Sequence, residues 1–330
     1  MPSEFDLIHR HFTRPTPSAT LGPGDDCALL EVTPGMQLAV TTDMLVAGTH
    51  FFPDTDPERL GWKALAVNLS DLAAMGARPR WITLAGSLPE ADEPWLAAFA
   101  KGLFACAEAY GAELVGGDTT RGPLNLCLTA LGEVPAAQAL RRDGAKAGDD
   151  IWVSGRPGLA ALGLAHLQGK VDLPQPWQKL CLTCLEKPRP RVELGLALRG
   201  VAHAAIDVSD GLLADLGHIA TRSGLAARIE LVQLPHLPKG PTPDSLPRAL
   251  ALHCQLAGGD DYELVFTAPP SARLALGEIA AKQELPLWCI GEMLAADEAQ
   301  AAGSVTVFDP DGKPVDIGAS GFDHFGNTPL

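Results

Sequence analysis

Basic residues are scarce in this sequence. Its 330 residues include 25 Lys and Arg against 40 Asp and Glu, which gives a formal net charge of −15. Nucleic acids and anionic membrane surfaces are bound through basic faces, so the composition excludes both as partners. The composition does not exclude an anionic small-molecule substrate, provided that metal ions lie between the substrate and the acidic side chains of the protein.

Long apolar runs are missing as well. No stretch approaches the roughly 18–20 consecutive apolar residues that cross a bilayer. The first residues, MPSEFDLIHRHF, contain acidic side chains and lack the apolar segment of a secretory signal. We therefore expect a cytoplasmic protein.

Cysteine is sparse and irregularly placed. The seven cysteines are scattered, and the single Cys-x-x-Cys pair, Cys181 and Cys184, has no second pair to accompany it. A structural zinc site usually takes four Cys or His ligands, so such a site is not expected. Free thiols in a reducing compartment are the simpler interpretation.

Two signatures of phosphate binding and nucleophilic catalysis are absent. The sequence contains no G-x-x-x-x-G-K-[ST] phosphate loop and no G-x-S-x-G elbow. The segment GRPG at 155–158 could present backbone N–H groups to an anion. A plain connection between a strand and a helix is the simpler interpretation of it.

What the sequence does contain is a globular composition, with 46% hydrophobic and 20% charged residues. The chain is long enough for two domains of ordinary size. The polar, glycine-containing segment AKAGDD at 145–150 separates two halves. We place the boundary there, with an N-terminal domain at 1–145 and a C-terminal domain at 146–330.

Apolar periodicity predicts alternating strands and helices in both halves. In the first half, strands are expected at 36–46, 81–88, 113–115 and 124–132, and helices at 57–76 and 93–110. In the second half, strands are expected at 151–154, up to 207 and at 262–267, and helices at 158–167, 191–198 and 212–223. The predicted fold class is α+β, with two α/β-type domains.

Aspartates recur where these expected elements end. Two GDD doublets, at 24–26 and 259–261, run directly into apolar residues and contain no Lys or Arg. Others lie in TTD at 41–43, NLSD at 68–71, GGD at 116–118 and DVSD at 207–210. A single one of these is most simply a helix cap or a turn residue.

As a set, the aspartates point to a metal site. Desolvating adjacent like charges costs several kcal/mol unless a positive group compensates. If these loop ends converge on one cleft, divalent cations have to neutralise them. Carboxylate and hydroxyl oxygens without recurring Cys or His favour Mg²⁺ over Zn²⁺, and Mg²⁺ typically bridges phosphates. We therefore expect a metal to supply the positive charge that both doublets lack.

Three further side chains could serve the same site. His50 follows the TTD motif closely, although a lone histidine is most simply structural. Arg121 and Arg142 could contact phosphate, because the arginine fork matches phosphate oxygens. An exposed salt bridge is the alternative for each arginine.

Taken together, these motifs resemble the thiamine-monophosphate kinase family, from the superfamily that includes aminoimidazole ribonucleotide synthetase and selenophosphate synthetase. The stretches similar to that family are GDDCALL, TTDMLVAGTHF, WKALAVNLSDLAAMGARP, GGDTTRGP, DVSDGL, GGDDYEL and the C-terminal GFDHF. They occur in order and span nearly the whole chain, which makes the resemblance specific.

The resemblance implies an activity and an architecture. The activity is ATP-dependent phosphorylation of thiamine monophosphate to thiamine diphosphate, the last step of thiamine diphosphate biosynthesis, with Mg²⁺ as cofactor and ATP as co-substrate. The protein would be a homodimer in which the N-terminal domain contributes to a shared β-barrel. The C-terminal α/β domain would complete the active site, with ATP in the cleft between the domains.

It also implies roles for individual residues. The magnesium-site positions are Asp26, Thr41, Thr42, Asp43, Asp71, Asp118, Asp207 and Asp210. The nucleotide-site positions are Gly117, Asp118, Arg142 and Ser209, and the substrate-contacting positions are His50, Asp260, Ala319 and Phe322. We expect catalysis, a direct in-line transfer without a phosphoenzyme, to rest on Asp43, Asp71, Asp118 and Asp210.

Two positions depart from the pattern of the family. Asp260 stands where the family often has glutamate, so the charge is kept while the reach is one methylene shorter. At the position of Ala319, members of the family often carry an aromatic side chain, which could stack on the thiamine ring. Phe322 is the alternative residue for that contact.

Two other functions stay open. One is that of another ATP-using enzyme of the same superfamily. Its selenide-activating members need a reactive residue near the N-terminus, and no cysteine precedes Cys27 here. The other is a non-catalytic protein that binds thiamine phosphate or senses metal, although a binding protein would not need carboxylates at every motif.

Overall fold

The structure is a computed structural model that describes residues 4–237, 246–298, 300–318 and 321. The chain divides into two compact units, the first formed by 1–72 and 77–139 and the second by 73–76 and 140–330. Both units mix helices with a sheet, so the expected fold class is confirmed at that level. In the described ranges, no helix is long and apolar enough to span a bilayer.

Unit 1 is built on a four-stranded sheet. Its strands neighbour one another in the order β1 (Met36–Val46), β4 (Asn125–Pro135), β2 (Arg78–Leu88) and β3 (Glu113–Arg121). The first two pairings are antiparallel, and β2 runs parallel to β3. Within the described part of one chain, this sheet is open and does not close into a barrel.

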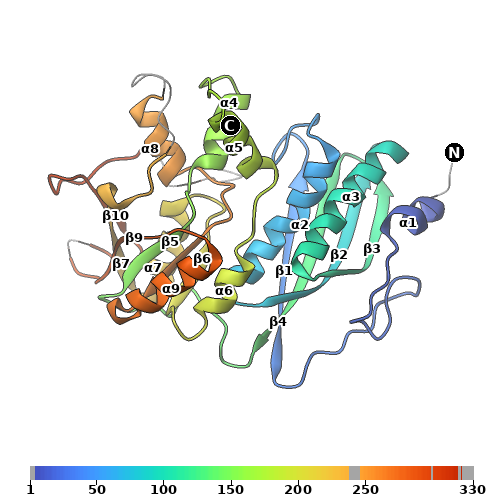
Figure 1. The fold of residues 1–330 in the computed structure, drawn as a ribbon, viewed down its shortest axis with the longest axis horizontal. Helices are drawn as coiled ribbons and strands as arrows, with labels where there is room; N and C mark the ends of the chain where they lie inside the picture. Colours follow the sequence, from blue (N-terminus) through green and yellow to red (C-terminus); the bar gives the residue numbers. More distant parts are fainter. Residues whose placement is uncertain (1–3, 238–245, 299, 319–320, 322–330) are drawn as a thin grey trace. The chain divides into compact units, whose positions relative to one another are not determined.

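Two long helices, α2 (Pro57–Ala74) and α3 (Glu93–Tyr110), cover one face of this sheet (Figure 1), and the short α1 (Glu4–Phe12) packs against α3. Glycines let α2 and α3 approach closely. A Cβ added at Gly61 would lie 2.0 Å from the carbonyl oxygen of Phe99, and one added at Gly102 would lie 1.8 Å from that of Glu58. The two helices therefore meet backbone to backbone.

The opposite face of the edge strand β1 is largely apolar and exposed. Alternate residues of a strand point to opposite faces. On β1, Leu45 is buried toward the helices, with 4% exposure. The large side chains of the other face, at 37–58% exposure, are Met36, Leu38, Val40 and Met44. We call these four residues the outer stripe of unit 1.

Unit 2 contains a six-stranded sheet. Its order is β10 (Val305–Phe308), β7 (Leu225–Glu230), β9 (Leu287–Ala295), β5 (Asp150–Ser154), β8 (Leu264–Ala268) and β6 (Ala204–Asp207). Among the strand pairs of the described residues of unit 2, only β10–β7 is parallel. Its helices are α4 (Leu159–Leu167), α5 (Trp177–Glu186), α6 (Val192–Leu198), α7 (Leu212–Ser223), α8 (Arg248–Leu256) and α9 (Arg273–Gln283), with 3-10 turns at Leu231–Gln233 and Pro270–Ala272.

The main core of unit 2 lies between this sheet and α7. Ile151 and Val265 of the sheet and Leu216 of α7 belong to one fully buried cluster. Trp152 of β5 lies between two residues of this cluster, Ile151 and Val153, and therefore points to the other face of the sheet. There it stacks on Phe266, with ring centroids 6.5 Å apart. The sheet therefore carries apolar side chains on both faces, as a sheet buried on both sides requires.

Most of the expected elements are present, with small shifts in their bounds. The strand predicted at 36–46 and the helices predicted at 93–110 and 212–223 have the predicted limits. The strand predicted at 113–115 continues to Arg121, and the helix predicted at 57–76 ends at Ala74. The elements that the periodicity did not indicate are α1, α5, α8, α9, β7, β9 and β10.

Candidate functional site

In unit 1, three of the predicted site residues gather where β1 runs beside α2. Thr41 and Asp43 share one face of the strand, and Asn68 and Asp71 share one face of the helix. The Thr41 hydroxyl donates to Oδ2 of Asp71. The backbone N–H of Asp43 donates to Oδ1 of Asn68 at 3.1 Å. The two contacts fasten the strand to the helix and bring three of the predicted residues together.

Asn68, to which the sequence motifs gave no role of its own, holds this part of the site in place. Its side chain is fully buried, and its Nδ2 donates to the carbonyl oxygen of Ala64 at 3.2 Å. Because β1 is an edge strand, the side-chain oxygen of Asn68 takes the place of a strand partner for Asp43. A polar residue between the buried Val67 and Leu69 was the available signal.

Two other predicted residues of unit 1 lie apart from this group. Thr42 points to the opposite face of the strand, where its hydroxyl lies 2.8 Å from that of Thr129. Asp118 is exposed on β3, and β4 and β2 separate that strand from β1. Along a flat sheet, three strand spacings amount to about 14 Å. The preceding Gly117 is needed sterically, because a Cβ there would lie 2.0 Å from the carbonyl oxygen of Leu84.

The first GDD doublet lies in an exposed loop. A bridge between Leu21 and Leu29 closes this loop, and the N–H of Asp26 donates to Oδ1 of Asp25 at 2.9 Å. Both aspartates are exposed. The expected desolvation of this doublet is therefore wrong for the single chain, because water can solvate both charges.

His50 stabilises the turn that follows β1. The N–H of Val46 donates to Nδ1 of His50 at 3.0 Å, and the N–H of His50 donates to the carbonyl oxygen of Val46 at 2.9 Å. Since Nδ1 accepts a hydrogen bond, the neutral ring carries its proton on Nε2. The ring is thus held in one tautomer close to the end of β1.

In unit 2, one carboxylate oxygen organises the loop that leads into α7. Oδ2 of Asp215 accepts the N–H groups of Ser209, Asp210 and Gly211 at 3.0, 3.1 and 3.1 Å. Burial, and next the charge of Asp210, raises the pKa of Asp215 to about 7 in spite of these donors. Asp207, at the end of β6, is also buried, with 4% exposure.

The second GDD doublet lies beside this loop. The N–H of Asp260 donates to the carbonyl oxygen of Ser209 at 2.9 Å, and the N–H of Tyr262 donates to the carbonyl oxygen of Val208 at 2.8 Å. Two predicted residues, Ser209 and Asp260, thus lie next to each other. The Tyr262 hydroxyl donates to Oδ1 of Asp260 at 2.9 Å.

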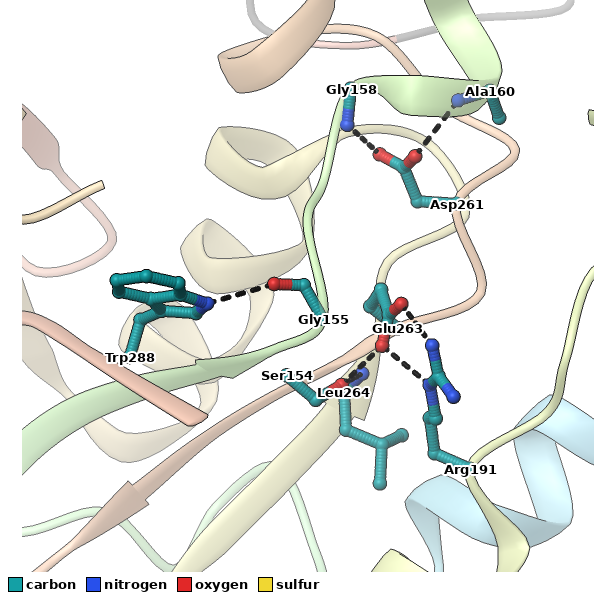
Figure 2. A network of polar contacts seen from close by, with 9 residues as sticks. All are labelled: Ser154, Gly155, Gly158, Ala160, Arg191, Asp261, Glu263, Leu264 and Trp288. Atoms are coloured by element: carbon teal, nitrogen blue, oxygen red, sulfur yellow. Dashed lines mark hydrogen bonds and ion pairs between the residues drawn. The ribbon is translucent and has the colours of Figure 1, made fainter. Parts of the chain in front are cut away.

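The neighbouring Asp261 is stabilised by the start of a helix. Its carboxylate accepts the N–H of Gly158 at 2.6 Å and that of Ala160 at 3.4 Å, in the first turn of α4 (Figure 2). The 155–158 segment therefore connects β5 to α4, and the N–H of Gly158 in it donates to the carboxylate of Asp261. Desolvation nevertheless raises the pKa of Asp261 well above its usual range.

Glu263 forms the second part of the same network (Figure 2). Its carboxylate accepts Nε and Nη2 of Arg191 at 2.6 and 2.5 Å, together with the Ser154 hydroxyl at 2.5 Å. The N–H of Leu264 donates to the Ser154 oxygen at 2.9 Å. The network joins the end of β5 to the start of β8 and to the segment before α6.

Groups of the protein itself therefore stabilise the second doublet, and metal binding there stays a prediction. Backbone N–H groups compensate Asp261, and a phenol hydroxyl compensates Asp260. Asp261 was noted only as part of the second doublet, and Asp215 and the Arg191–Glu263 pair were given no role from the sequence. Arg191 and Glu263 are 72 residues apart, so no local pattern relates them.

The remaining predicted residues are placed as follows. Arg142 is exposed, and its carbonyl oxygen accepts the hydroxyl of Ser223 at 3.0 Å, at the C-terminal end of α7. Ser209 precedes the other end of this 12-residue helix, which spans about 18 Å. Ala319 and Phe322 lie outside the described residues.

The oxygen donors of unit 1 suit Mg²⁺. In the part of the chain that the structure describes, no three His, Cys, Asp or Glu side chains converge on one ion position. Mg²⁺ does not need such a cage, because it binds through one or two carboxylates and completes its coordination with water and phosphate oxygens. Thr41, Asp43 and Asp71 provide hard oxygen ligands of this kind, without the Cys or His that zinc favours.

Comparison with known proteins gives matches over both units. Residues 24–134 match the family "AIR synthase related protein, N-terminal domain", and residues 146–303 match its C-terminal domain. The thiamine-monophosphate kinase of Salmonella typhimurium is 48% identical over 330 residues, which cover 98% of each chain.

Solved structures agree with these matches. The thiamine-monophosphate kinase from Stenotrophomonas maltophilia K279a is 50% identical, with a TM-score of 0.80, and the match covers 90% of this chain and 92% of that one. The structure of AaThiL complexed with AMPPCP and TMP is 30% identical, with a TM-score of 0.73, and the match covers 97% and 96% of the two chains.

Proposed function

Because the chain belongs to the thiamine-monophosphate kinase family of AIR synthase related proteins, we propose that it transfers the terminal phosphoryl group of ATP to thiamine monophosphate, giving thiamine diphosphate and ADP. The observation that carries this proposal is 48% identity to a thiamine-monophosphate kinase over 98% of both chains. The relative solved with AMPPCP and TMP supports the same pair of substrates, a nucleotide and a phosphate ester.

The acceptor needs little activation. The second pKa of a phosphate monoester is roughly 6, so the attacking oxygen is already ionised near neutral pH. The main obstacle is repulsion between two anions, which makes positioning and charge compensation the work of the protein. We propose a direct in-line transfer. A phosphorylated enzyme trapped by rapid quench with labelled ATP would contradict it.

The carboxylates have a shared role in this proposal. Asp43 and Asp71, joined to Thr41 and Asn68, would hold Mg²⁺ in unit 1. Thr42 on the opposite face of β1, Asp118 on β3 and Asp26 in its exposed loop would bind further Mg²⁺ ions. Asp207 and Asp210 would act from unit 2. Bound Mg²⁺ would supply the positive charge that lets the two phosphate groups approach.

The other roles divide between the substrates. Gly117, Asp118, Arg142 and Ser209 would contact ATP, and His50 and Asp260 would contact thiamine monophosphate. The hydrogen bond that fixes the His50 ring and the one that fixes the Asp260 carboxylate support this assignment, since both side chains have one defined orientation. Ala319 or Phe322 remains the proposed partner of the thiamine ring.

A second copy of the chain would cover the outer stripe of unit 1. Helices cover one face of the four-stranded sheet, and an antiparallel sheet that faces water normally carries polar residues on its other face. Here that face carries Met36, Leu38, Val40 and Met44, all exposed. Apposition of two such sheets would bury both stripes and form the shared β-barrel.

The activity is tested with purified protein, thiamine monophosphate, ATP and Mg²⁺. We expect many equivalents of thiamine diphosphate and ADP per chain, whereas at most one equivalent would favour a binding protein instead. Asp71→Asn should lower kcat by about 100-fold or more, the scale seen when one charge-stabilising group is removed. Asp311→Asn, at an exposed position of unit 2, is the matched control and should leave kcat unchanged.

A further inference from the structure

The GDDYEL segment holds two residues in an uncommon backbone conformation. Asp260 has a φ of 68° and Tyr262 a φ of 51°, and in the described chain only Ala137 and Glu284 share this property among non-glycine residues. Such conformations are strained for residues with a side chain, and they persist only where the surroundings fix them. Their clustering often marks a functional site.

The surroundings fix this segment at four points. Asp261 is bound by the first turn of α4, and Glu263 is bound by Arg191 and Ser154. The N–H groups of Asp260 and Tyr262 themselves donate to the loop before α7. Residues 260 and 262 are therefore held from both flanks and through their own backbones.

The side chain of Tyr262 completes this arrangement. The residue is buried, with 8% exposure, and a buried phenol hydroxyl needs a hydrogen-bond partner. Its partner is Oδ1 of Asp260 at 2.9 Å. Asp260 is only half-buried, so its carboxylate can meet a ligand while the phenol sets its orientation.

We propose that Tyr262 is a positioning residue, whose hydroxyl holds the Asp260 carboxylate in the orientation that contacts thiamine monophosphate. This inference rests on the proposed function, in which Asp260 contacts that substrate. A carboxylate repels the phosphate end, so its partner is the organic end of the molecule, which carries the thiazolium cation and the aminopyrimidine. Tyr262 then affects binding of this substrate and not of ATP.

Tyr262→Phe tests the proposal, because it keeps the buried ring and removes only the hydroxyl. We expect the KM for thiamine monophosphate to rise about 3- to 10-fold, the scale of one lost hydrogen bond, with kcat and the KM for ATP unchanged. Calorimetric titration of thiamine monophosphate without ATP should show the same loss of affinity. Tyr110→Phe, at the only other tyrosine, near the end of α3, should change none of these values.

A double-mutant comparison separates positioning from a general structural effect. If Tyr262 acts through Asp260, adding Tyr262→Phe to Asp260→Ala raises this KM no further than Asp260→Ala alone. Additive effects, an unchanged KM in Tyr262→Phe, or an equal loss of ATP binding would overturn the inference. An unchanged KM in Asp260→Ala would overturn it together with the assignment of Asp260, and absence of kinase activity in the wild type would refute the proposed function itself.

Discussion

Two carboxylates of unit 2, those of the buried Asp215 and the half-buried Asp261, are hydrogen-bonded by backbone N–H groups. Asp215 accepts three of them and Asp261 accepts two. These donors favour the ionised forms, yet desolvation outweighs them, since the pKa of Asp215 rises to about 7 and that of Asp261 rises well above its usual range. The folded protein therefore keeps protons that the unfolded chain has already released.

This difference predicts a pH dependence of stability. The unfolded chain loses the Asp261 proton near the ordinary aspartate pKa of about 3.9, whereas the folded chain keeps this proton to higher pH. Between the two pKa values the folded state binds more protons, so the free energy of unfolding falls as pH rises through that window. We expect Asp261→Asn to make this fall shallower in urea unfolding between about pH 5 and pH 8.

The matched control for this measurement is Asp311→Asn, at an exposed acid of the same unit. It should reproduce the wild-type slope. If the free energy of unfolding of Asp261→Asn falls as steeply with pH as that of the wild type, then the Asp261 carboxyl is not the group that keeps its proton. The cause assigned to its pKa would then be wrong.

At the scale of secondary-structure elements, the contact of α2 with α3 makes a sharp prediction. A Cβ at Gly102 would overlap the carbonyl oxygen of Glu58, so Gly102→Ala has to push the helices apart. We expect a loss of about 1–3 kcal/mol, as for other overpacked sites, and a lower midpoint of thermal unfolding.

Gly277→Ala in α9 is the corresponding control, because an added Cβ there meets no atom within 4 Å. In an open helical position, alanine is favoured over glycine by up to about 1 kcal/mol. Its midpoint should therefore be unchanged or higher. Equal losses in both variants would contradict the close packing of α2 and α3.

The elements also show what periodicity can and cannot predict. β1 and α2 were predicted closely because both carry a continuous apolar pattern. β7 and β9, with sequences LAARIE and LWCIGEMLA, carry charged residues within the strand, and they are defined by their pairing with each other and by that of β9 with β5. Tertiary pairing of this kind is not visible in a single segment.

The same limit applies to the candidate site. Asp43, Asp71, Asp207, Ser209 and Asp210 were proposed from motifs, because their chemistry and spacing are local, and their roles stay predictions. The residues that hydrogen-bond to their backbone could not be named in this way. Asn68 lies on α2 and accepts the N–H of Asp43 on β1, and Asp215 lies inside α7 and accepts N–H groups of the loop that precedes this helix. A buried polar side chain in an apolar pattern is the signal to follow in each case.

At the scale of the whole molecule, the outer stripe of unit 1 predicts the oligomeric state. Val40 is 58% exposed in the single chain, so Val40→Lys should be tolerated by a monomer but should disrupt an interface formed by two sheets. We expect the wild type to sediment as a dimer and Val40→Lys as a monomer.

Leu274→Lys provides the comparison, because Leu274 is 85% exposed on α9, away from the outer stripe in the sequence and in a different unit. It should sediment as the wild type does. A monomeric wild type, or a Val40→Lys variant that stays dimeric, would contradict the proposed role of the stripe.

The loops ahead of α4 and α7 have one more implication for nucleotide affinity. Main-chain amides at helix starts are the usual cradle for a polyphosphate, but here the amides of Gly158, Ser209, Asp210 and Gly211 already serve Asp261 and Asp215. With that cradle occupied, the triphosphate depends on cations for its attraction to so acidic a protein. Chelating the divalent ions with EDTA should therefore abolish AMPPCP binding itself, not merely slow turnover, and calorimetry would register the difference.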